Sequence, residues 1–357
     1  MRHEQLVRPI VLTLAVWLGA SGLAPAQGGE DWSALDSRLQ SFVPGKVNGL
    51  TLMVARHGRI IYTRALGNQT PESVLPIASA TKMPSGVVIM ALVERGLIKL
   101  DEPVATYLEG KIDWPADKAA VTTRMLFNHT SGVSVDAPCL NNRATTTLKD
   151  CAQAIANQPL EFTPPGSRFA YSGSSMQVAG YVAEVVSGKR WNDLFSEIVA
   201  RPLGLRKFTY TETNNPRIAG GASSDVGDYT RILQTVLAGG VWQGQRVLSP
   251  ATVALMLTDQ VAGIPKLRSP GGTTLTGYSF GWWHSDPAFL TRQPAPQTRG
   301  PELSDQGAFG CTPWIDLGLN YSAILLIRDR RSTGTAIWDQ IRPLIVEQIN
   351  KHTLPRR

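Results

Sequence analysis

The grouping of helix-like and strand-like segments along the chain is the feature that most constrains its fold. Apolar residues recur at helical spacing over 31–42, and the segments 50–55 and 59–66 predict a β-hairpin around His57-Gly58. Residues 101–213 are mostly of helical type. Strand-like segments and a closing amphipathic helix follow, at 278–284, 307–314, 321–328 and 333–351. Strand groups joined by hairpins favour an antiparallel sheet over a wound parallel sheet.

This grouping predicts an α+β fold, in which an antiparallel sheet is flanked by helices and carries an inserted all-helical lobe. The sheet lobe would comprise about residues 31–100 and 214–357 of one domain, residues 27–357, and the helical lobe about residues 101–213. The other expected elements are helices at 79–97, 121–129, 148–157, 174–187, 191–200 and 225–238, and Pro/Gly-rich loops at 264–273 and 293–301. A boundary between a sheet and an inserted lobe is a common place for a pocket.

Residues 1–26 have the pattern of a secretory signal peptide. Arg2 and Arg8 precede an apolar stretch over 10–23, which ends in the small residues Ala24-Pro25-Ala26. We expect cleavage after Ala26 and a periplasmic or secreted protein, because the apolar part is short for a membrane span. An uncleaved anchor is the alternative. No later segment has an apolar run of spanning length, so the mature chain should have no stable membrane span.

The three cysteines are Cys139, Cys151 and Cys311. Cysteines of an exported protein can pair in an oxidising compartment. Cys139 and Cys151 are close in sequence and flank the polar segment 140–143, so we predict a disulfide between them. Cys311 lies in an apolar segment and is expected to be a small core residue.

Composition and missing motifs exclude several classes of function. A hydrophobic content of 43% suits a large buried core rather than a disordered chain. The formal net charge is +7, but no basic run is interleaved with aromatic residues, so we expect no nucleic-acid partner. The chain has no His-Glu-x-x-His motif and no phosphate-binding glycine loop, so no metal and no cofactor is predicted.

The first candidate for chemistry is Ser79-Ala80-Thr81-Lys82, the only Ser-x-x-Lys in the chain. Ser79 and Lys82 would share one helical face, and the helix N-terminus favours a neutral lysine and a developing alkoxide. A desolvated lysine can act as a base near neutral pH. Because about one Ser-x-x-Lys is expected by chance in a chain of this length, a purely structural role is the alternative for the motif alone.

Two later segments give that motif its context. Phe169-Ala170-Tyr171-Ser172-Gly173 follows a turn signal at 164–166 and precedes a predicted helix. The segment 304–310 is rich in small residues, which lets a substrate approach the backbone closely. The three segments in this order resemble the serine β-lactamase and penicillin-binding-protein superfamily, in which Ser-x-x-Lys and a Lys-Thr-Gly strand are signatures.

The resemblance covers most of the chain from about residue 31. Segments 98–104, 201–205 and 220–224 are similar to family segments, and 126–132 resembles the family's His-Thr-Ser-Gly turn, which makes His129 a structural turn residue. The class C β-lactamases, the D-Ala-D-Ala carboxypeptidases and the family VIII esterases are the most similar types. They imply a β-lactamase/transpeptidase-like fold.

Carried over position by position, the resemblance implies a role for each motif residue. Ser79 would attack the carbonyl carbon, Lys82 would take or hold its proton, and Tyr171 would pass a proton to the leaving group. The backbone N–H groups of Ser79 and Ala308 would form the oxyanion hole. The substrate would be contacted by Gly173, Asp305, Gln306 and Gly307.

Two positions depart from the family pattern. The tyrosine motif usually ends in an asparagine that helps hold the motif lysine and the substrate amide, but here it ends in Gly173. The third motif usually begins with a cation that meets a substrate carboxylate, but here Asp305 stands in its place. An aspartate facing the substrate would repel a carboxylate, unless a basic residue from elsewhere, such as Arg143 or Arg299, covers the site.

These observations predict an exported serine hydrolase that forms an acyl-enzyme on Ser79 and favours esters or small amides. Its partner would be a small-molecule ester, amide or peptide substrate. A β-lactamase or D-Ala-D-Ala carboxypeptidase is one alternative. A non-catalytic, penicillin-binding-like ligand-binding protein is the other, and the presence of Ser79, Lys82 and Tyr171 together disfavours it.

Overall fold

The computed structural model describes residues 31–142, 144–270, 275–285 and 301–351. Within these ranges the largest element is a seven-stranded sheet in the order β10-β11-β12-β13-β14-β1-β2, in which all neighbours are antiparallel. The strands are β1 (Gly49–Arg56), β2 (Arg59–Gly67), β10 (Leu275–Tyr278), β11 (Trp283–Ser285), β12 (Glu302–Ser304), β13 (Thr312–Asp316) and β14 (Tyr321–Ile327). The α+β arrangement with an antiparallel sheet is therefore confirmed.

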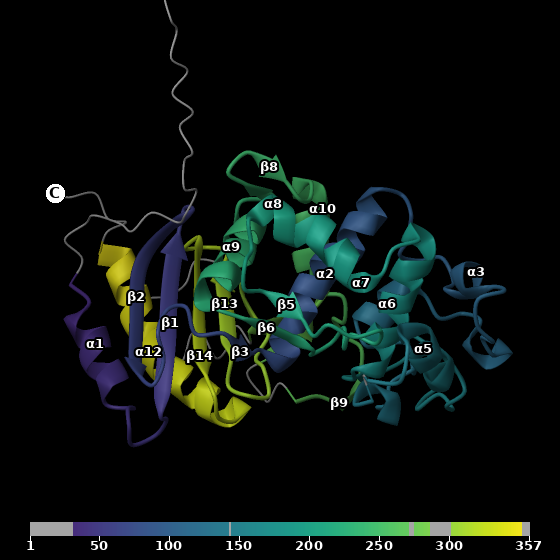
Figure 1. The fold of residues 1–357 in the computed structure, drawn as a ribbon, viewed down its shortest axis with the longest axis horizontal. Coiled ribbons are helices and arrows are strands. Elements are labelled where there is room, and N and C mark those ends of the chain that lie inside the picture. Colours follow the sequence, from purple (N-terminus) through teal and green to yellow (C-terminus); the bar gives the residue numbers. More distant parts are fainter. Residues whose placement is uncertain (1–30, 143, 271–274, 286–300, 352–357) are drawn as a thin grey trace, which may run out of the picture.

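The two faces of the sheet belong to different cores, because side chains alternate along each strand. Leu50, Leu52 and Val54 of β1 pack in the cluster beneath α1 (Ser33–Gln40) and α12 (Arg331–Lys351), whereas Met53 packs in the larger cluster on the opposite face. Since helices cover both faces, β1 and β14 are almost entirely buried. α1 and α12 lie on the left of the sheet in Figure 1.

The helical lobe packs against the opposite face and shares its core. One cluster runs from Met53 and Ile324 in the sheet to Phe127 and Ile155 in the lobe. α2 (Lys82–Glu94) is apolar on all sides, because it stands between the sheet and the other helices of the lobe. The other helices are α3 (Ala105–Leu108), α4 (Thr123–Phe127), α5 (Leu148–Ala156), α6 (Ser174–Ser187), α7 (Trp191–Phe195), α8 (Arg201–Leu203), α9 (Val226–Leu237) and α10 (Pro250–Leu257).

Short strands bring distant segments together between the two lobes. β3 (Leu75–Pro76) pairs with β6 (Ala222–Ser224), so residues 222–224 lie beside the entry to Ser79. β4 (Phe169–Ala170), which precedes Tyr171, pairs in parallel with β9 (Lys266–Arg268). β5 (Thr209–Tyr210), β7 (Val241–Trp242) and β8 (Gln245–Arg246) complete the small sheets of the described residues.

Three expectations about local structure were wrong in detail. The predicted loop 264–273 contains β9, because the N–H of Tyr171 finds its acceptor in the Arg268 carbonyl at 3.1 Å. The segment 278–284 is not one strand: it contains the end of β10, a turn in which Gly281 has φ of +94°, and the start of β11. The segment 307–314 begins with a turn and becomes a strand only at Thr312.

The helix expected at 79–97 also differs, since it starts with a 3₁₀ turn, Ala78–Thr81, before α2 begins. The expected signal peptide, the loop residues 293–300, Arg143 and Arg299 lie outside the described residues. Among the described residues, no helix is both long enough and apolar enough to cross a membrane.

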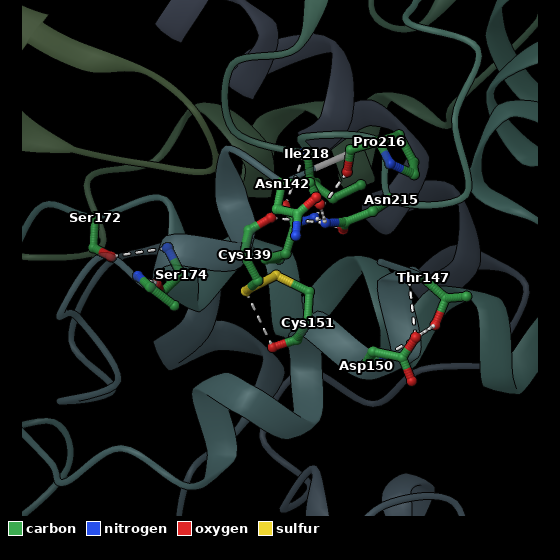
Figure 2. Close-up of a disulfide and its surroundings, with 12 residues drawn as sticks. Cys139, Asn142, Thr147, Asp150, Cys151, Ser172, Ser174, Asn215, Pro216 and Ile218 are labelled. Atoms are coloured by element: carbon green, nitrogen blue, oxygen red, sulfur yellow. Dashed lines mark hydrogen bonds between the residues drawn. A yellow bond between two sulfur atoms is a disulfide. The ribbon is translucent and has the colours of Figure 1, made fainter. Parts of the chain in front are cut away.

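The disulfide in the structure joins Cys139 and Cys151, the two cysteines that the sequence paired, with Cα atoms 5.4 Å apart. Cys311 is buried with a free thiol. Figure 2 shows the bridge between α5 and the segment that leads to Asn142. Beside it, the side-chain amide of Asn215 donates to the Cys139 carbonyl at 2.9 Å, which ties this segment to the loop before β6.

Candidate active site

Ser79 is presented by a sharp turn at the N-terminal end of α2. Ala78 has φ of +47°, in the left-handed region that residues with a Cβ rarely adopt, and the chain then enters the 3₁₀ turn. Strain of this kind persists only where surrounding structure enforces it. The turn leaves Ser79 half-buried between buried neighbours, so the hydroxyl is accessible from one side.

Lys82 lies one turn further along and is buried against Ser79. Its Nζ donates to Ser79 Oγ at 3.1 Å and to the carbonyl of Ala219 at 2.8 Å. Burial lowers the pKa of Lys82 to about 8, because desolvation disfavours the ammonium; the attraction of Asp305 opposes this, and the repulsion of Arg217 adds to it. Lys82 can therefore hold or release a proton near neutral pH, within reach of the serine hydroxyl.

Tyr171 completes the group from the opposite side. The centroid of its ring lies 4.5 Å from Lys82 Nζ, and it lines the same cavity as Ser79. Burial raises the pKa of Tyr171 well above its usual value, with the Asp305 charge adding to the rise. The phenol is thus protonated under all ordinary conditions and is suited to donate a hydrogen bond or a proton.

His129 supports this arrangement from beneath. The ring is buried; its Nε2 lies 3.1 Å from the Tyr278 hydroxyl, and its Nδ1 accepts from the Ser172 N–H at 3.4 Å. Burial lowers the pKa of His129 well below its usual value, so the imidazole is neutral. This is the position of a structural turn residue, and no direct contact to Ser79 is present among the described interactions.

The third motif approaches the serine through its backbone. A Cβ on Gly307 would lie 2.2 Å from the Ile77 carbonyl oxygen, so only glycine permits this contact beside the nucleophile turn. The chain then turns, and Ala308 lines the same cavity as Ser79, together with the exposed ring of Phe309. The two residues expected to supply the oxyanion hole are therefore at one cavity.

Asp305 does not take the place that the sequence suggested. Its side chain is completely buried near the start of α2 and does not line the cavity around Ser79. Neither carboxylate oxygen has a hydrogen-bond partner of good geometry among the described residues, although the nearby N–H groups of Met83 and Lys82 favour its charged form. Burial raises the pKa of Asp305 well above its usual value, and the attraction of Lys82 opposes the rise. Gln306 and Gly307 are also buried and lie outside the cavity lining.

The cavity at Ser79 has a volume of about 220 Å³. It contains the three expected catalytic residues and two charged residues that sequence reasoning missed, Asp136 and Arg217. A larger cavity, of about 700 Å³, has no serine, lysine or tyrosine among the described residues that line it, which are Asn141, Asn142, Ala144, Arg190, Thr211, Glu212, Thr213 and Asn214. The smaller cavity is therefore the candidate active site.

Gly173 lines this cavity where the family has an asparagine. Asp136 occupies the adjacent space: its Oδ1 accepts from the Gly173 N–H at 2.9 Å and from Ser172 Oγ at 3.1 Å. A Cβ on Gly173 would lie 3.2 Å from Leu140 Cδ1, so a larger side chain would have to displace its neighbours. A polar group from another loop therefore stands beside the position of the missing amide.

The described residues contain no group of three or more His, Cys, Asp or Glu side chains that could hold a metal ion. The chemistry of the cavity is instead that of a serine hydroxyl, a lysine with a pKa of about 8 and a protonated phenol. This set of groups is suited to nucleophilic attack and proton transfer.

Comparisons with known proteins agree with this geometry. A model of the family described as Beta-lactamase matches residues 35–343. Penicillin-binding protein 4 of Amycolatopsis lactamdurans is 29% identical over 70% of this chain and 72% of its own length. Esterase EstB of Burkholderia gladioli is 30% identical over 56% of this chain, which spans little more than half, 58%, of that relative.

Solved structures show the same likeness at the level of the fold. A beta-lactamase-type protein of Bacteroides dorei DSM 17855 superposes with a TM-score of 0.75 at 27% identity, covering 89% of this chain and 99% of its own. The family match takes in well over half of the chain and includes Ser79, Lys82 and Tyr171. The protein is therefore a member of the beta-lactamase family and a serine hydrolase.

Proposed function

We propose that the protein hydrolyses esters or small amides through an acyl-enzyme on Ser79. The Ser79 hydroxyl attacks the substrate carbonyl carbon while the neutral Lys82 amine accepts its proton. The backbone N–H groups of Ser79 and Ala308 stabilise the negative oxygen of the tetrahedral intermediate. The bond to the leaving group then breaks, Tyr171 gives it a proton, and Lys82 returns a proton to Tyr171. A water molecule repeats the attack and releases the acid.

The observation that carries this proposal is the contact of 3.1 Å between Lys82 Nζ and Ser79 Oγ, with the lysine buried and its pKa lowered to about 8. A nucleophile and a base within hydrogen-bond reach are the geometric requirement of nucleophilic catalysis. Tyr171, a second group that can give a proton, lines the same cavity as Ser79, with its ring centroid 4.5 Å from Lys82 Nζ. This arrangement argues against a protein that only binds ligands.

A β-lactamase or D-Ala-D-Ala carboxypeptidase activity is the second candidate. The likeness to a penicillin-binding protein favours it, and so does the guanidinium of Arg217 in the cavity. Asp305 is buried outside the cavity, so it is not expected to repel a substrate carboxylate. EstB, whose name denotes an esterase, supports the first candidate.

We also propose that the protein is exported, with cleavage after Ala26. The pattern of residues 1–26 and a disulfide between Cys139 and Cys151 support a periplasmic or secreted location. Expression of the full chain in a bacterial host, followed by fractionation and N-terminal sequencing, tests this. A mature N-terminus at Gln27 is expected, and an intact Met1 in the cytoplasmic fraction would contradict it.

Steady-state kinetics on three substrates test the activity: p-nitrophenyl butyrate, nitrocefin and a D-Ala-D-Ala peptide. Turnover of the ester that is abolished by Ser79→Ala is the expected result. Efficient turnover of nitrocefin with negligible ester hydrolysis would favour the second candidate. Absence of turnover on all three, with no labelling of Ser79, would favour the ligand-binding alternative.

A further inference from the structure

Arg217 is a cation in the wall of the cavity, and none of the three sequence motifs contains it. It lies on the loop between β5 and β6, and it lines the cavity together with Ser79 and Lys82. Its charge is close enough to Lys82 to contribute to the lowered pKa of that lysine. An arginine so near to the reacting groups can act on substrate as well as on Lys82.

The loop around Arg217 is fixed from both sides. The side-chain amide of Gln177, in α6, donates to Asn215 Oδ1 at 2.7 Å and to the Pro216 carbonyl at 2.8 Å, and its oxygen accepts from the Ile218 N–H at 3.0 Å. Asn215 is in turn bound to the Cys139 carbonyl beside the disulfide, as Figure 2 shows. The backbone that carries Arg217 is therefore held in place before any ligand binds, which is what a specific binding site needs.

The Arg217 guanidinium has hydrogen-bond donors that lack a close acceptor among the described residues. Nη1 reaches Asn141 Oδ1 only at 3.4 Å, and Nε is buried without an acceptor among the described residues. Arg217 forms no ion pair with Asp136 or any other carboxylate of the described residues. A guanidinium has five donors, and a carboxylate is its best-matched partner. Because Nε is enclosed, the donors that remain for a ligand in the cavity are those of the two terminal nitrogens.

We propose that Arg217 selects substrates that carry an anionic group, most simply a carboxylate, next to the scissile bond. This rests on the proposed hydrolysis at Ser79 and names its substrate class. Asp136 lines the same cavity, and its carboxylate repels a negative charge of the substrate that comes close to it. The anionic group of the substrate should therefore lie near Arg217 and away from Asp136. Arg217 is thus a specificity residue, while Ser79, Lys82 and Tyr171 carry out the bond changes.

Matched pairs of esters test the proposal. Mono-p-nitrophenyl adipate and its neutral methyl ester differ in charge on the acyl part; 4-acetoxybenzoate and its methyl ester differ in charge on the leaving group. In the wild type, kcat/KM should favour the anion in at least one pair. Arg217→Gln should reduce that preference by about ten- to a hundredfold, since a charge-assisted contact to the anion is lost. Removal of the Arg217 charge also raises the pKa of Lys82, but this lowers kcat/KM for both members of a pair alike and leaves their ratio unchanged.

Three variants separate specificity from other effects. Arg217→Lys should restore part of the preference, and Asp136→Asn should increase it. Arg246→Gln removes the same charge from an exposed strand outside the cavity and should leave the preference unchanged. Equal loss on both members of a pair in Arg217→Gln, or an unchanged ratio in both pairs, would overturn the proposal.

Protection of Ser79 gives a readout that does not need ester turnover. Adipate should slow fluorophosphonate labelling of Ser79 in the wild type, and Arg217→Gln should abolish this protection. Labelling of Ser79 without any protection by adipate, combined with normal hydrolysis of neutral esters, would reject the anion site while leaving the proposed hydrolase intact. Failure of Ser79 to react at all would instead reject the proposed function.

Discussion

The Nζ atom of Lys82 lies 3.1 Å from Ser79 Oγ and 2.8 Å from the Ala219 carbonyl oxygen. These two contacts orient the lysine toward the nucleophile and join the helix that carries it to the loop that carries Arg217. Because the lysine is buried, its pKa falls to about 8, and its neutral form is accessible at ordinary pH. In the proposed mechanism, proton transfer from Ser79 depends on this pair and on the charges around it.

The activity should rise with pH through the pKa of Lys82. The neutral amine is the base, so kcat/KM on an ester should increase from pH 6 to 9 with a midpoint of about 8. Lys82→Arg, which stays protonated, should lack this rise and lose about two to four orders of magnitude in turnover. A flat profile in the wild type would show that Lys82 is not the titrating base.

Asp305→Asn should move that midpoint below the wild-type value. The buried carboxylate attracts the Lys82 ammonium and so raises the pKa of Lys82. After its removal, the lowering of the Lys82 pKa by desolvation and by the Arg217 charge is opposed only by the weaker attraction of Asp136. The pH profile of kcat/KM is the measurement, and a midpoint equal to that of the wild type would mean that Asp305 carries no charge in the free enzyme.

Tyr171→Phe should lower turnover by about two to four orders of magnitude, the usual effect of removing a positioned proton donor. The phenylalanine keeps the ring that packs over Lys82. Thermal unfolding should therefore change little. A variant with near-full rate on p-nitrophenyl butyrate would assign Tyr171 a structural role only.

Gly307→Ala should damage the oxyanion hole. The added Cβ would lie 2.2 Å from the Ile77 carbonyl oxygen, which is a backbone atom, so the third motif has to move away from the Ser79 turn. We expect a loss of about ten- to a thousandfold in kcat, together with a destabilisation of about 1–3 kcal/mol. Gly45→Ala is the matched control, because a Cβ at that position would have no atom within 4 Å.

The disulfide should stabilise the wall of the active site. Cys139→Ser/Cys151→Ser should lower the free energy of unfolding by about 3 kcal/mol, the value expected for a loop closed over a separation of 12 residues. Denaturant unfolding measures this. Non-reducing mass spectrometry of the exported protein should show the linked peptides, and two free thiols would contradict the pairing. Cys311→Ser should leave the linked peptides unchanged.

The motif Ser79-x-x-Lys82 could be found in the sequence because its two residues are one helical turn apart. Tyr171 lies far along the chain from them and could be assigned only through the resemblance to the family. Arg217 and Asp136 could not be found, since the fold brings them to the cavity through contacts between distant segments, such as those of Gln177 with the loop at 215–218. Nothing in the local sequence marks either residue.

The direction of the Asp305 side chain was also not predictable from the sequence. Its position in the third motif suggested a side chain facing the substrate, but it lies just after β12 and its side chain is buried near the start of α2. The cavity instead meets the chain at Ala308, after the turn. Where a strand ends in a turn, the sequence does not reveal which of its side chains face the active site. The antiparallel sheet and the helical lobe were predictable because their apolar patterns are long.

The most direct test of the account is the identity of the residue that forms the acyl-enzyme. Treatment of the protein with a fluorophosphonate, followed by peptide mapping, should place a single adduct on Ser79, and Ser79→Ala should abolish both the adduct and ester hydrolysis. An adduct on another serine, or hydrolysis that survives in Ser79→Ala, would contradict the mechanism.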